Sequence, residues 1–177
     1  MDSVADNLAR AAKVKLMIFD VDGVLTDGSL HFGPDGEMMK TFNVYDGLGI
    51  KLLQESGVQT AIISARRSAI TARRAQDLGI THVHQGGHDK LTPFLELLAL
   101  TGLTEEQCGY IGDDVIDAPL LRRVGFAVSV PGGRAEAQGL AHHVTQAGGG
   151  RGAVREICEF LLRAQDNYAR VMAPFLE

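Results

Sequence analysis

The chain has no excess of positive charge and no long apolar run, and each absence narrows the range of possible functions. It has 17 Lys and Arg residues against 22 Asp and Glu residues, which gives a formal net charge of −5. A negative balance argues against nucleic acid or an anionic membrane surface as the main partner. No apolar stretch approaches the ~20 residues that a membrane-spanning helix needs. We therefore expect neither a nucleic-acid partner nor a membrane partner.

Cysteine is also scarce, because only Cys108 and Cys158 occur in the chain. Two isolated thiols are typical of reduced, packed side chains rather than of a disulfide framework. Residues 1–12 are polar and alanine-rich, and they contain no apolar core of the kind that a signal peptide has. Together these features predict a cytoplasmic protein.

The length and composition of the chain, 177 residues with 45% hydrophobic residues, are those of one globular domain. Strand-like apolar runs alternate with helical patterns, and several helical patterns end at a glycine, a common helix stop signal. This alternation predicts an α/β fold, a Rossmann-like, doubly wound parallel sheet with helices on both faces. The predicted strands are 15–19, 59–63, 82–84, 109–111, 125–130 and 142–144, and the predicted helices are 47–56, 65–78, 90–101, 116–123, 133–139 and 153–166.

Two segments depart from this alternation. Residues 29–42 contain two short strand patterns around a Gly-Pro-Asp-Gly turn, which predicts a small β-hairpin inserted after the first strand. The hairpin is too short to form a cap domain. Residues 148–177 form a tail in which the glycine-rich run 148–152 precedes the amphipathic pattern 153–166. We interpret the whole chain, 1–177, as a single domain.

The most informative motif is Asp20-Val21-Asp22-Gly23, because its two carboxylates stand where an apolar strand ends. Ligands of parallel α/β sheets bind at the carboxyl ends of the strands, and two carboxylates this close repel each other unless a cation or substrate is present. The first carboxylate can attack phosphorus to form an aspartyl-phosphate, and the second can protonate the leaving oxygen and then activate water. An EF-hand begins similarly, but the twelfth position counted from Asp20 is His31, not Glu.

Two further strand ends supply groups that suit a phosphate. Ser64 follows the strand pattern 59–63, and its hydroxyl can hold a phosphoryl oxygen. Lys90 comes after the pattern 82–84 and at the start of a predicted helix, where it can balance the charge of the nucleophile and of the phosphate. We therefore predict that Ser64 and Lys90 act with Asp20 and Asp22 as catalytic residues.

A second acidic cluster follows the strand pattern 109–111, in the run Gly112-Asp113-Asp114-Val115-Ile116-Asp117. Mg²⁺ prefers oxygen ligands, few of them from the protein. We predict that Asp20, Asp22 and Asp113 form a Mg²⁺ site with the help of a backbone carbonyl. Asp114 and Asp117 are alternatively interpreted as helix N-caps.

Taken in order along the chain, these four motifs resemble the haloacid dehalogenase superfamily of phosphohydrolases. A closer resemblance is to the family of 3-deoxy-D-manno-octulosonate 8-phosphate phosphatases. It rests on residues 20–28, 42–50, 85–86 and 149–156. The resemblance implies a capless, tetrameric, Mg²⁺-dependent enzyme. Such an enzyme removes phosphate from an eight-carbon keto acid sugar during lipopolysaccharide synthesis, through an aspartyl-phosphate.

The resemblance also implies which residues contact the substrate. The family's substrate loop corresponds to Asn43, Val44, Tyr45, Asp46 and Gly47, and its basic residues correspond to Lys51, Arg66 and Arg74, with Lys90 at the phosphate. Arg66 and Arg74 are eight residues apart, so they would share one face of the predicted helix 65–78. Arginine is well suited to the carboxylate of a sugar acid.

A capless chain of this size needs another source of water exclusion, and a neighbouring subunit can provide it. The hairpin at 29–42 has strand edges that could pair between subunits in a closed oligomer. The run 148–152 is flexible enough to reach over an adjacent site, where Arg151 would meet the anionic groups of the substrate. We predict a homotetramer with Arg151 as a substrate-binding residue.

Two departures from the family's pattern keep alternatives open. Ser64-Ala65 stands where the pattern has Thr-Gly, which keeps the hydroxyl. Tyr45 stands where the pattern has Arg, which removes a positive charge near the substrate loop. The nearest alternative is therefore the same chemistry on a nine-carbon sugar acid 9-phosphate of the sialic or ketodeoxynonulosonic type. A non-catalytic assembly module is a third possibility, although all four motifs are intact.

Overall fold

A six-stranded parallel sheet forms the centre of the protein in the computed structural model, which describes residues 3–176. Residues 1–2 and 177 of the predicted domain lie outside the described part. The strands, in spatial order, are β5 (His82–Gln85), β4 (Gln59–Ser64), β1 (Leu16–Phe19), β6 (Cys108–Ile111), β7 (Phe126–Ser129) and β8 (His143–Val144). Every neighbouring pair is parallel. The α/β, Rossmann-like prediction is confirmed.

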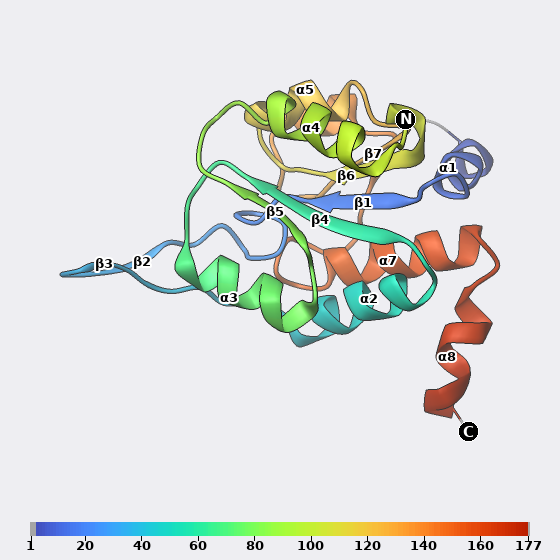
Figure 1. The fold of residues 1–177 in the computed structure, drawn as a ribbon, viewed down its shortest axis with the longest axis horizontal. Coiled ribbons are helices and arrows are strands. Elements are labelled where there is room, and N and C mark those ends of the chain that lie inside the picture. Colours follow the sequence, from blue (N-terminus) through green and yellow to red (C-terminus); the bar gives the residue numbers. More distant parts are fainter. Residues whose placement is uncertain (1–2, 177) are drawn as a thin grey trace.

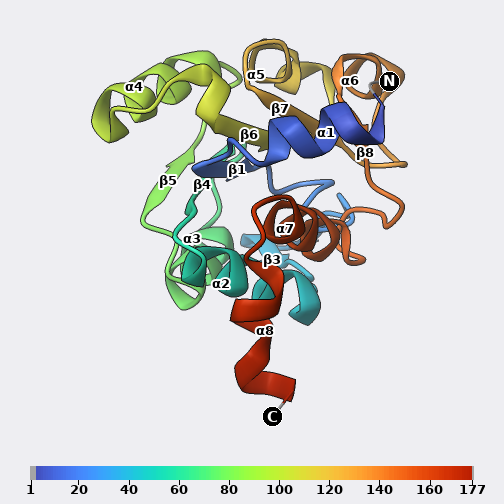
Figure 2. The ribbon, with the colours of Figure 1, turned by 90° about the vertical axis from the view of Figure 1, so that its right-hand side faces the viewer.

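Helices cover both faces of the sheet, as the alternating pattern predicts (Figures 1 and 2). One face carries α2 (Val44–Glu55), α3 (Ala69–Leu78) and α7 (Ala153–Ala164), and the other carries α4 (Leu91–Thr101), α5 (Ala118–Leu121) and α6 (Ala135–Leu140). Two 3₁₀ turns, η1 (Glu105–Gln107) and η2 (Val115–Asp117), flank β6. The sheet therefore separates two apolar cores, one beneath each helical layer.

Two terminal helices were not among the predicted elements. Helix α1 (Val4–Ala11) begins with a capping box in which Ser3 and Asp6 bond each other's backbone amides. Helix α8 (Tyr168–Leu176) follows a turn at Asp166 and points away from the body (Figure 1). It contains Pro174, a residue that usually argues against a helix interior. The length and apolar character needed to cross a bilayer are not combined in any helix between residues 3 and 176.

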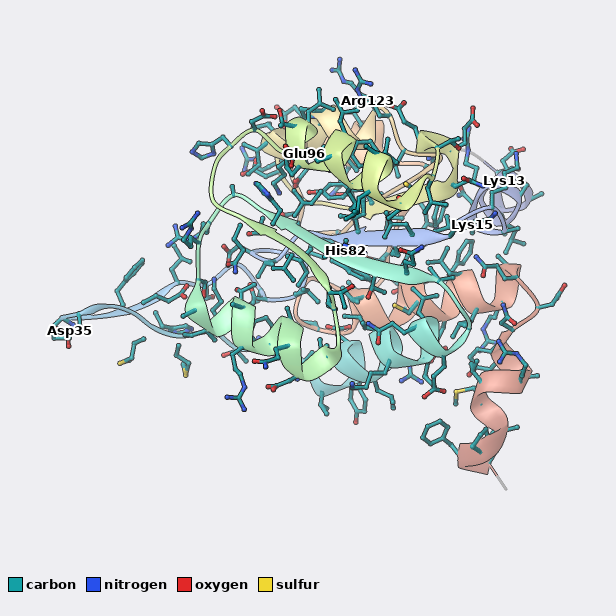
Figure 3. The ribbon with its side chains drawn as sticks, viewed as in Figure 1. Lys13, Lys15, Asp35, His82, Glu96 and Arg123 are labelled. Carbon is teal, nitrogen blue, oxygen red and sulfur yellow. The ribbon has the colours of Figure 1, made fainter. Side chains whose placement is uncertain are left out.

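The predicted hairpin is present as β2 (His31–Gly33) and β3 (Gly36–Met39), which pair in antiparallel fashion. It projects from the body beside the carboxyl ends of the central strands (Figure 1), and Asp35 marks its tip (Figure 3). Its apolar side chains Phe32 and Met38 are exposed. Within residues 3–176, the connection from β1 to α2 contains this hairpin and no larger insertion, as expected for a fold without a cap domain.

The start of α3 is the main error in the predicted boundaries. The helix begins at Ala69 instead of residue 65, because the side chain of Ser68 caps it by accepting a hydrogen bond from the Thr71 amide at 3.2 Å. Residues 65–67 are therefore not helical, and Arg66 does not lie on the helix that carries Arg74. The expectation that the two arginines share a helix face is wrong.

Candidate active site

Three central strands deliver their polar residues to one pocket at the carboxyl edge of the sheet. Asp20 and Asp22 follow β1, Ser64 ends β4, and Asp113 follows β6. Because β4, β1 and β6 are adjacent and parallel, their ends meet on the side from which the hairpin projects (Figure 1). The pocket has a volume of about 250 Å³, and its lining residues are Asp20, Asp22, Ser64, Ala65, Arg66, His88, Asp113, Asp114 and Ile116.

A cluster of three carboxylates forms the base of the site. One carboxylate oxygen from each of Asp20, Asp113 and Asp117 lies within 4.8 Å of the others. Asp113 packs against Gly23 so closely that a Cβ at Gly23 would collide with its carboxylate, and Gly23 has a φ of 94°. Glycine at this position lets the two loops approach each other.

The residues present fit a divalent cation. The Oδ1 atom of Asp113 is buried and has no hydrogen-bond partner, although a buried carboxylate oxygen normally has one. Asp20 and Asp113 offer the hard oxygen ligands that Mg²⁺ prefers.

Lys90 is the cation inside this cluster, and it is almost completely buried. Its Nζ atom lies 2.9 Å from Asp20 Oδ1 and 2.5 Å from Asp117 Oδ1. It also donates to the hydroxyl of Tyr110 at 3.1 Å, and that hydroxyl donates to Asp117 at 2.5 Å. Burial disfavours a charged lysine, but the two carboxylates outweigh burial and raise the pKa of Lys90 above its ordinary value. The lysine therefore remains protonated beside Asp20.

Two acids of the cluster, Asp20 and Asp113, have raised pKa values. Burial raises the pKa of Asp20 to about 7, while Lys90 opposes this shift and Asp117 adds to it. Burial, followed by repulsion from Asp117 and Asp114, raises the pKa of Asp113 to about 6. A bound cation would relieve both effects, since an opposite charge nearby favours the ionised form.

Asp117 acts as the organiser of the loop after β6, a role that the interpretation of it as an N-cap did not anticipate. Its Oδ2 atom accepts hydrogen bonds from the backbone amides of Asp113 at 2.9 Å and Asp114 at 3.0 Å. Asp114 is the residue that caps η2, through the Val115 amide. Asp117 therefore orients Asp113 and Lys90 together.

The side chain of Asp22 lies apart from the carboxylate cluster. Its Oδ1 atom bonds to the Nζ atom of Lys40, and its Oδ2 atom lies 3.6 Å from the Nε atom of Arg66. Both carboxylate oxygens are thus engaged by cations on the hairpin side of the pocket. The role of Asp22 as a metal ligand stays a prediction, because this carboxylate pairs with Lys40 and Arg66 and does not belong to the cluster of Asp20, Asp113 and Asp117.

The predicted substrate loop is the N-cap and first turn of α2. Asn43 caps the helix by accepting from the Tyr45 amide at 2.8 Å. Val44 and Tyr45 are exposed, Tyr45 to 66%. Asp46 instead is buried and accepts a hydrogen bond from the Arg155 amide at 2.7 Å, at the start of α7. Asp46 thus links α2 to the segment that follows the glycine-rich run.

The remaining predicted basic residues lie around this turn. Arg74 packs against Gly47, and its guanidinium lies 5.7 Å from the centre of the Phe42 ring. Lys51 is exposed on α2, one turn beyond Gly47. None of these side chains lines the pocket that contains Asp20.

The glycine-rich run is tied to its own chain. Gly149 lies directly against the Gly23 carbonyl, where no Cβ would fit, and the Gly150 amide donates to the Val24 carbonyl at 2.9 Å. Arg151 is 74% exposed and lies 3.4 Å from Asp27. The run therefore covers the loop that follows Asp22, with the Arg151 side chain directed to its own Asp27.

Several residues of the site were not identified from the sequence. Tyr110 lies inside a predicted strand, where an apolar side chain is the ordinary interpretation. Lys40 follows the hairpin without any local signal. His88 lines the pocket, and its only signal is its place two residues before Lys90. These roles depend on contacts between distant segments.

The chain is 49% identical over 164 residues to the 3-deoxy-D-manno-octulosonate 8-phosphate phosphatase of Yersinia pestis, a match that covers 92% of this chain and 88% of that protein. The chain belongs to this phosphatase family. No protein-family model matches it. The resemblance to this family, which rests on residues 20–28, 42–50, 85–86 and 149–156, is confirmed.

Solved structures of phosphatases have the same fold as this chain. A probable YrbI family phosphatase from Pseudomonas syringae pv. phaseolica 1448a has a TM-score of 0.95 at 50% identity, over 98% of each chain. The 3-deoxy-D-manno-octulosonate 8-phosphate phosphatase of Moraxella catarrhalis, solved with a magnesium ion, a phosphate ion and KDO, has a TM-score of 0.95 at 42% identity. That match covers 98% of this chain and 99% of the Moraxella chain.

Proposed function

We propose that this chain is a Mg²⁺-dependent phosphatase that hydrolyses 3-deoxy-D-manno-octulosonate 8-phosphate to the free sugar acid and phosphate. The observation that carries the proposal is the convergence of Asp20, Asp113 and buried Lys90 at one end of the central strands, in a chain of this family. A carboxylate nucleophile, a cation site and a fixed ammonium are what phosphoryl transfer needs. The reaction belongs to lipopolysaccharide precursor synthesis.

The chain's own residues supply the two chemical steps. An oxygen of Asp20 attacks phosphorus as the bond to the sugar oxygen breaks, and Asp22 gives that oxygen a proton. Asp22 then takes a proton from the water that attacks the aspartyl-phosphate, which returns Asp20 and releases phosphate. Ser64 and Lys90 stabilise charge on the phosphoryl oxygens. Asp20 and Asp113, with Asp22 as the predicted third ligand, would hold Mg²⁺, which would neutralise charge on the phosphate and help to orient it.

The predicted substrate residues bind the sugar acid. Arg66 is the predicted carboxylate ligand that lines the pocket, while Asn43 to Gly47, Lys51 and Arg74 lie at or near the first turn of α2. The solved complex of the Moraxella relative with KDO favours the eight-carbon acid. Tyr45 is the residue on which a nine-carbon acid would depend, because it replaces an arginine of the family's pattern.

We also propose a homotetramer that acts in the cytoplasm. The exposed apolar residues Phe32, Met38 and Met39 of the hairpin support assembly, because an unpaired two-stranded hairpin with such residues is marginal in water. Arg151 is exposed enough to leave Asp27 and reach a ligand. The two isolated cysteines support the location, because both are buried free thiols.

A panel of sugar-acid phosphates tests the substrate. We expect the highest kcat/KM for the eight-carbon 8-phosphate in the presence of Mg²⁺, and little turnover of nine-carbon 9-phosphates. A purified Asp20→Asn protein is the control for contaminating phosphatases. A higher kcat/KM for a nine-carbon acid would reject the proposed substrate, and no Mg²⁺-dependent turnover of any member would reject the proposed reaction.

A further inference from the structure

A buried lysine lies directly beside Asp22. Lys40 follows β3 at the base of the hairpin, and its side chain is 1% exposed. Its ammonium bonds to Asp22 and lies 3.1 Å from Glu37 Oε1. A buried ammonium group is tolerated only when anions pair with it. The position of Lys40 is therefore fixed by these two carboxylates.

The same network continues from Glu37 into α3. The second oxygen of Glu37 accepts a hydrogen bond from the hydroxyl of Ser68, the residue that caps α3. Burial opposes ionisation of Glu37, but the hydrogen bonds from Ser68 and Lys40 outweigh it and lower the pKa of Glu37. The chain Asp22, Lys40, Glu37 and Ser68 thus connects the loop after β1, the hairpin and the start of α3.

Asp22 has a second cation of a different kind. Arg66 lies 3.6 Å from the other carboxylate oxygen, but its side chain is 43% exposed and lies over the Phe32 ring. An exposed ion pair is weak and leaves its arginine able to move to a ligand. Lys40, in contrast, cannot move to a ligand in this way, because its side chain is buried.

We propose that Lys40 is a positioning residue for proton transfer by Asp22, so that the base of the hairpin belongs to the catalytic apparatus. This inference rests on the proposed phosphatase reaction. Lys40 acts through Asp22 and does not touch the substrate. It holds the Asp22 carboxylate in the pocket that Asp20 also lines, where Asp22 can reach the ester oxygen. A proton passes from Asp22 to the ester oxygen as the P–O bond breaks, and Asp22 later regains one from water, while Lys40 keeps its own protons.

Aryl phosphates of different leaving-group basicity provide the test. p-Nitrophenolate is a weak base and departs with little need for a proton. Phenolate is a stronger base, so its departure depends more on protonation by a general acid. We expect Lys40→Met to lower kcat/KM for phenyl phosphate about 10-fold or more, which is part of the roughly 10²–10⁴-fold that general acid catalysis supplies, and for p-nitrophenyl phosphate less than about threefold. In an Asp22→Asn background, Lys40→Met should add no further leaving-group dependence, because the two residues act as a unit.

The controls separate positioning from folding. Lys13→Met removes a lysine at the amino end of β1, far from the hairpin (Figure 3), and should leave both rates unchanged. Glu37→Gln weakens the network without touching Asp22, so we expect a smaller loss that is again greater for phenyl phosphate than for p-nitrophenyl phosphate. If Lys40→Met does not fold, Glu37→Gln serves as the test in its place. Equal losses for both substrates, or wild-type rates in folded Lys40→Met or Glu37→Gln, would overturn the assignment. Wild-type protein without Mg²⁺-dependent turnover of the aryl phosphates or of any sugar-acid phosphate would overturn the reaction itself, and the assignment with it.

Discussion

Replacing Asp113 with Asn should stabilise the metal-free protein while it weakens Mg²⁺ binding and catalysis. The buried Oδ1 atom of Asp113 has no hydrogen-bond partner, and no cation lies within ion-pair distance of its carboxylate among the described residues. Burial and the charges of Asp117 and Asp114 raise its pKa to about 6 from 3.8. Asn keeps the shape of the side chain and removes the charge that is repelled.

The magnitude and sign follow from linkage. Each pKa unit corresponds to about 1.4 kcal/mol, so ionised Asp113 lowers the free energy of unfolding by about 3 kcal/mol. The folded state holds the proton more tightly than the unfolded state does. The stabilising contribution of the protonated acid is therefore complete below pH 3.8, and it is lost as the pH rises through about 6.

Urea unfolding in EDTA at pH 5 and pH 8 measures this effect. At pH 8 we expect the free energy of unfolding of Asp113→Asn to exceed that of wild type by about 3 kcal/mol. At pH 5 we expect a smaller difference. Asp35→Asn at the hairpin tip is the matched control and should change little. Mg²⁺ should stabilise wild type at pH 8 by mass action, but not Asp113→Asn. An Asp113→Asn protein that is no more stable than wild type at pH 8 would refute the reasoning.

Three further predictions concern activity. Asp20→Asn should fold but lose turnover by several powers of ten, because an amide is a poor nucleophile; turnover above ~1% of wild type would remove Asp20 from this role. Excess EDTA should abolish turnover, and Ca²⁺ should inhibit by binding with looser geometry; full activity in a chelated sample would contradict the metal site. Arg151→Ala should raise KM and leave the tetramer intact; light scattering that finds a monomer, or unchanged kinetics, would contradict the role of Arg151 as a lid.

The strands and the residues at their ends were predictable because both signals are local. A short apolar run followed by a polar residue identifies Asp20 and Ser64 directly. Parallel α/β topology then places the carboxyl ends of the strands at one edge of the sheet, while the order in which β4, β1 and β6 lie side by side comes from the structure. Asp113 was predictable for the same reason, and only its proximity to Gly23 required the structure.

The contacts that refine the site were not predictable because they join distant segments. Lys40 contacts Asp22 across the hairpin, and Asp46 caps α7 across 109 positions of sequence. The error at the start of α3 has a local cause, since Ser68 was a possible cap within a stretch that already contained the polar Ser64. The residues after Ser64 suit a helix, so the sequence did not show whether Ser64 or Ser68 would be the N-cap of α3.

Removing residues 148–177 should unfold the protein, so such a truncation is no test of the glycine-rich run. Helix α7 buries four large apolar side chains, Val154, Ile157, Leu161 and Leu162. At roughly 1.5–3 kcal/mol each, their burial contributes about 6–12 kcal/mol, which is comparable with the whole stability of a domain. A chain that ends at Asp166 keeps α7 and loses only α8, in which Val171 is the buried residue.

We therefore expect residues 1–166 to unfold cooperatively in urea and residues 1–147 to lack a cooperative transition, as followed by circular dichroism. A cooperative transition in the chain of residues 1–147 would show that α7 is dispensable and that the apolar core on its side of the sheet is held by α2 and α3. If the shorter chain fails to fold, loss of its activity says nothing about the run 148–152. A single substitution at Arg151 is the appropriate test, because it leaves every buried side chain of α7 in place.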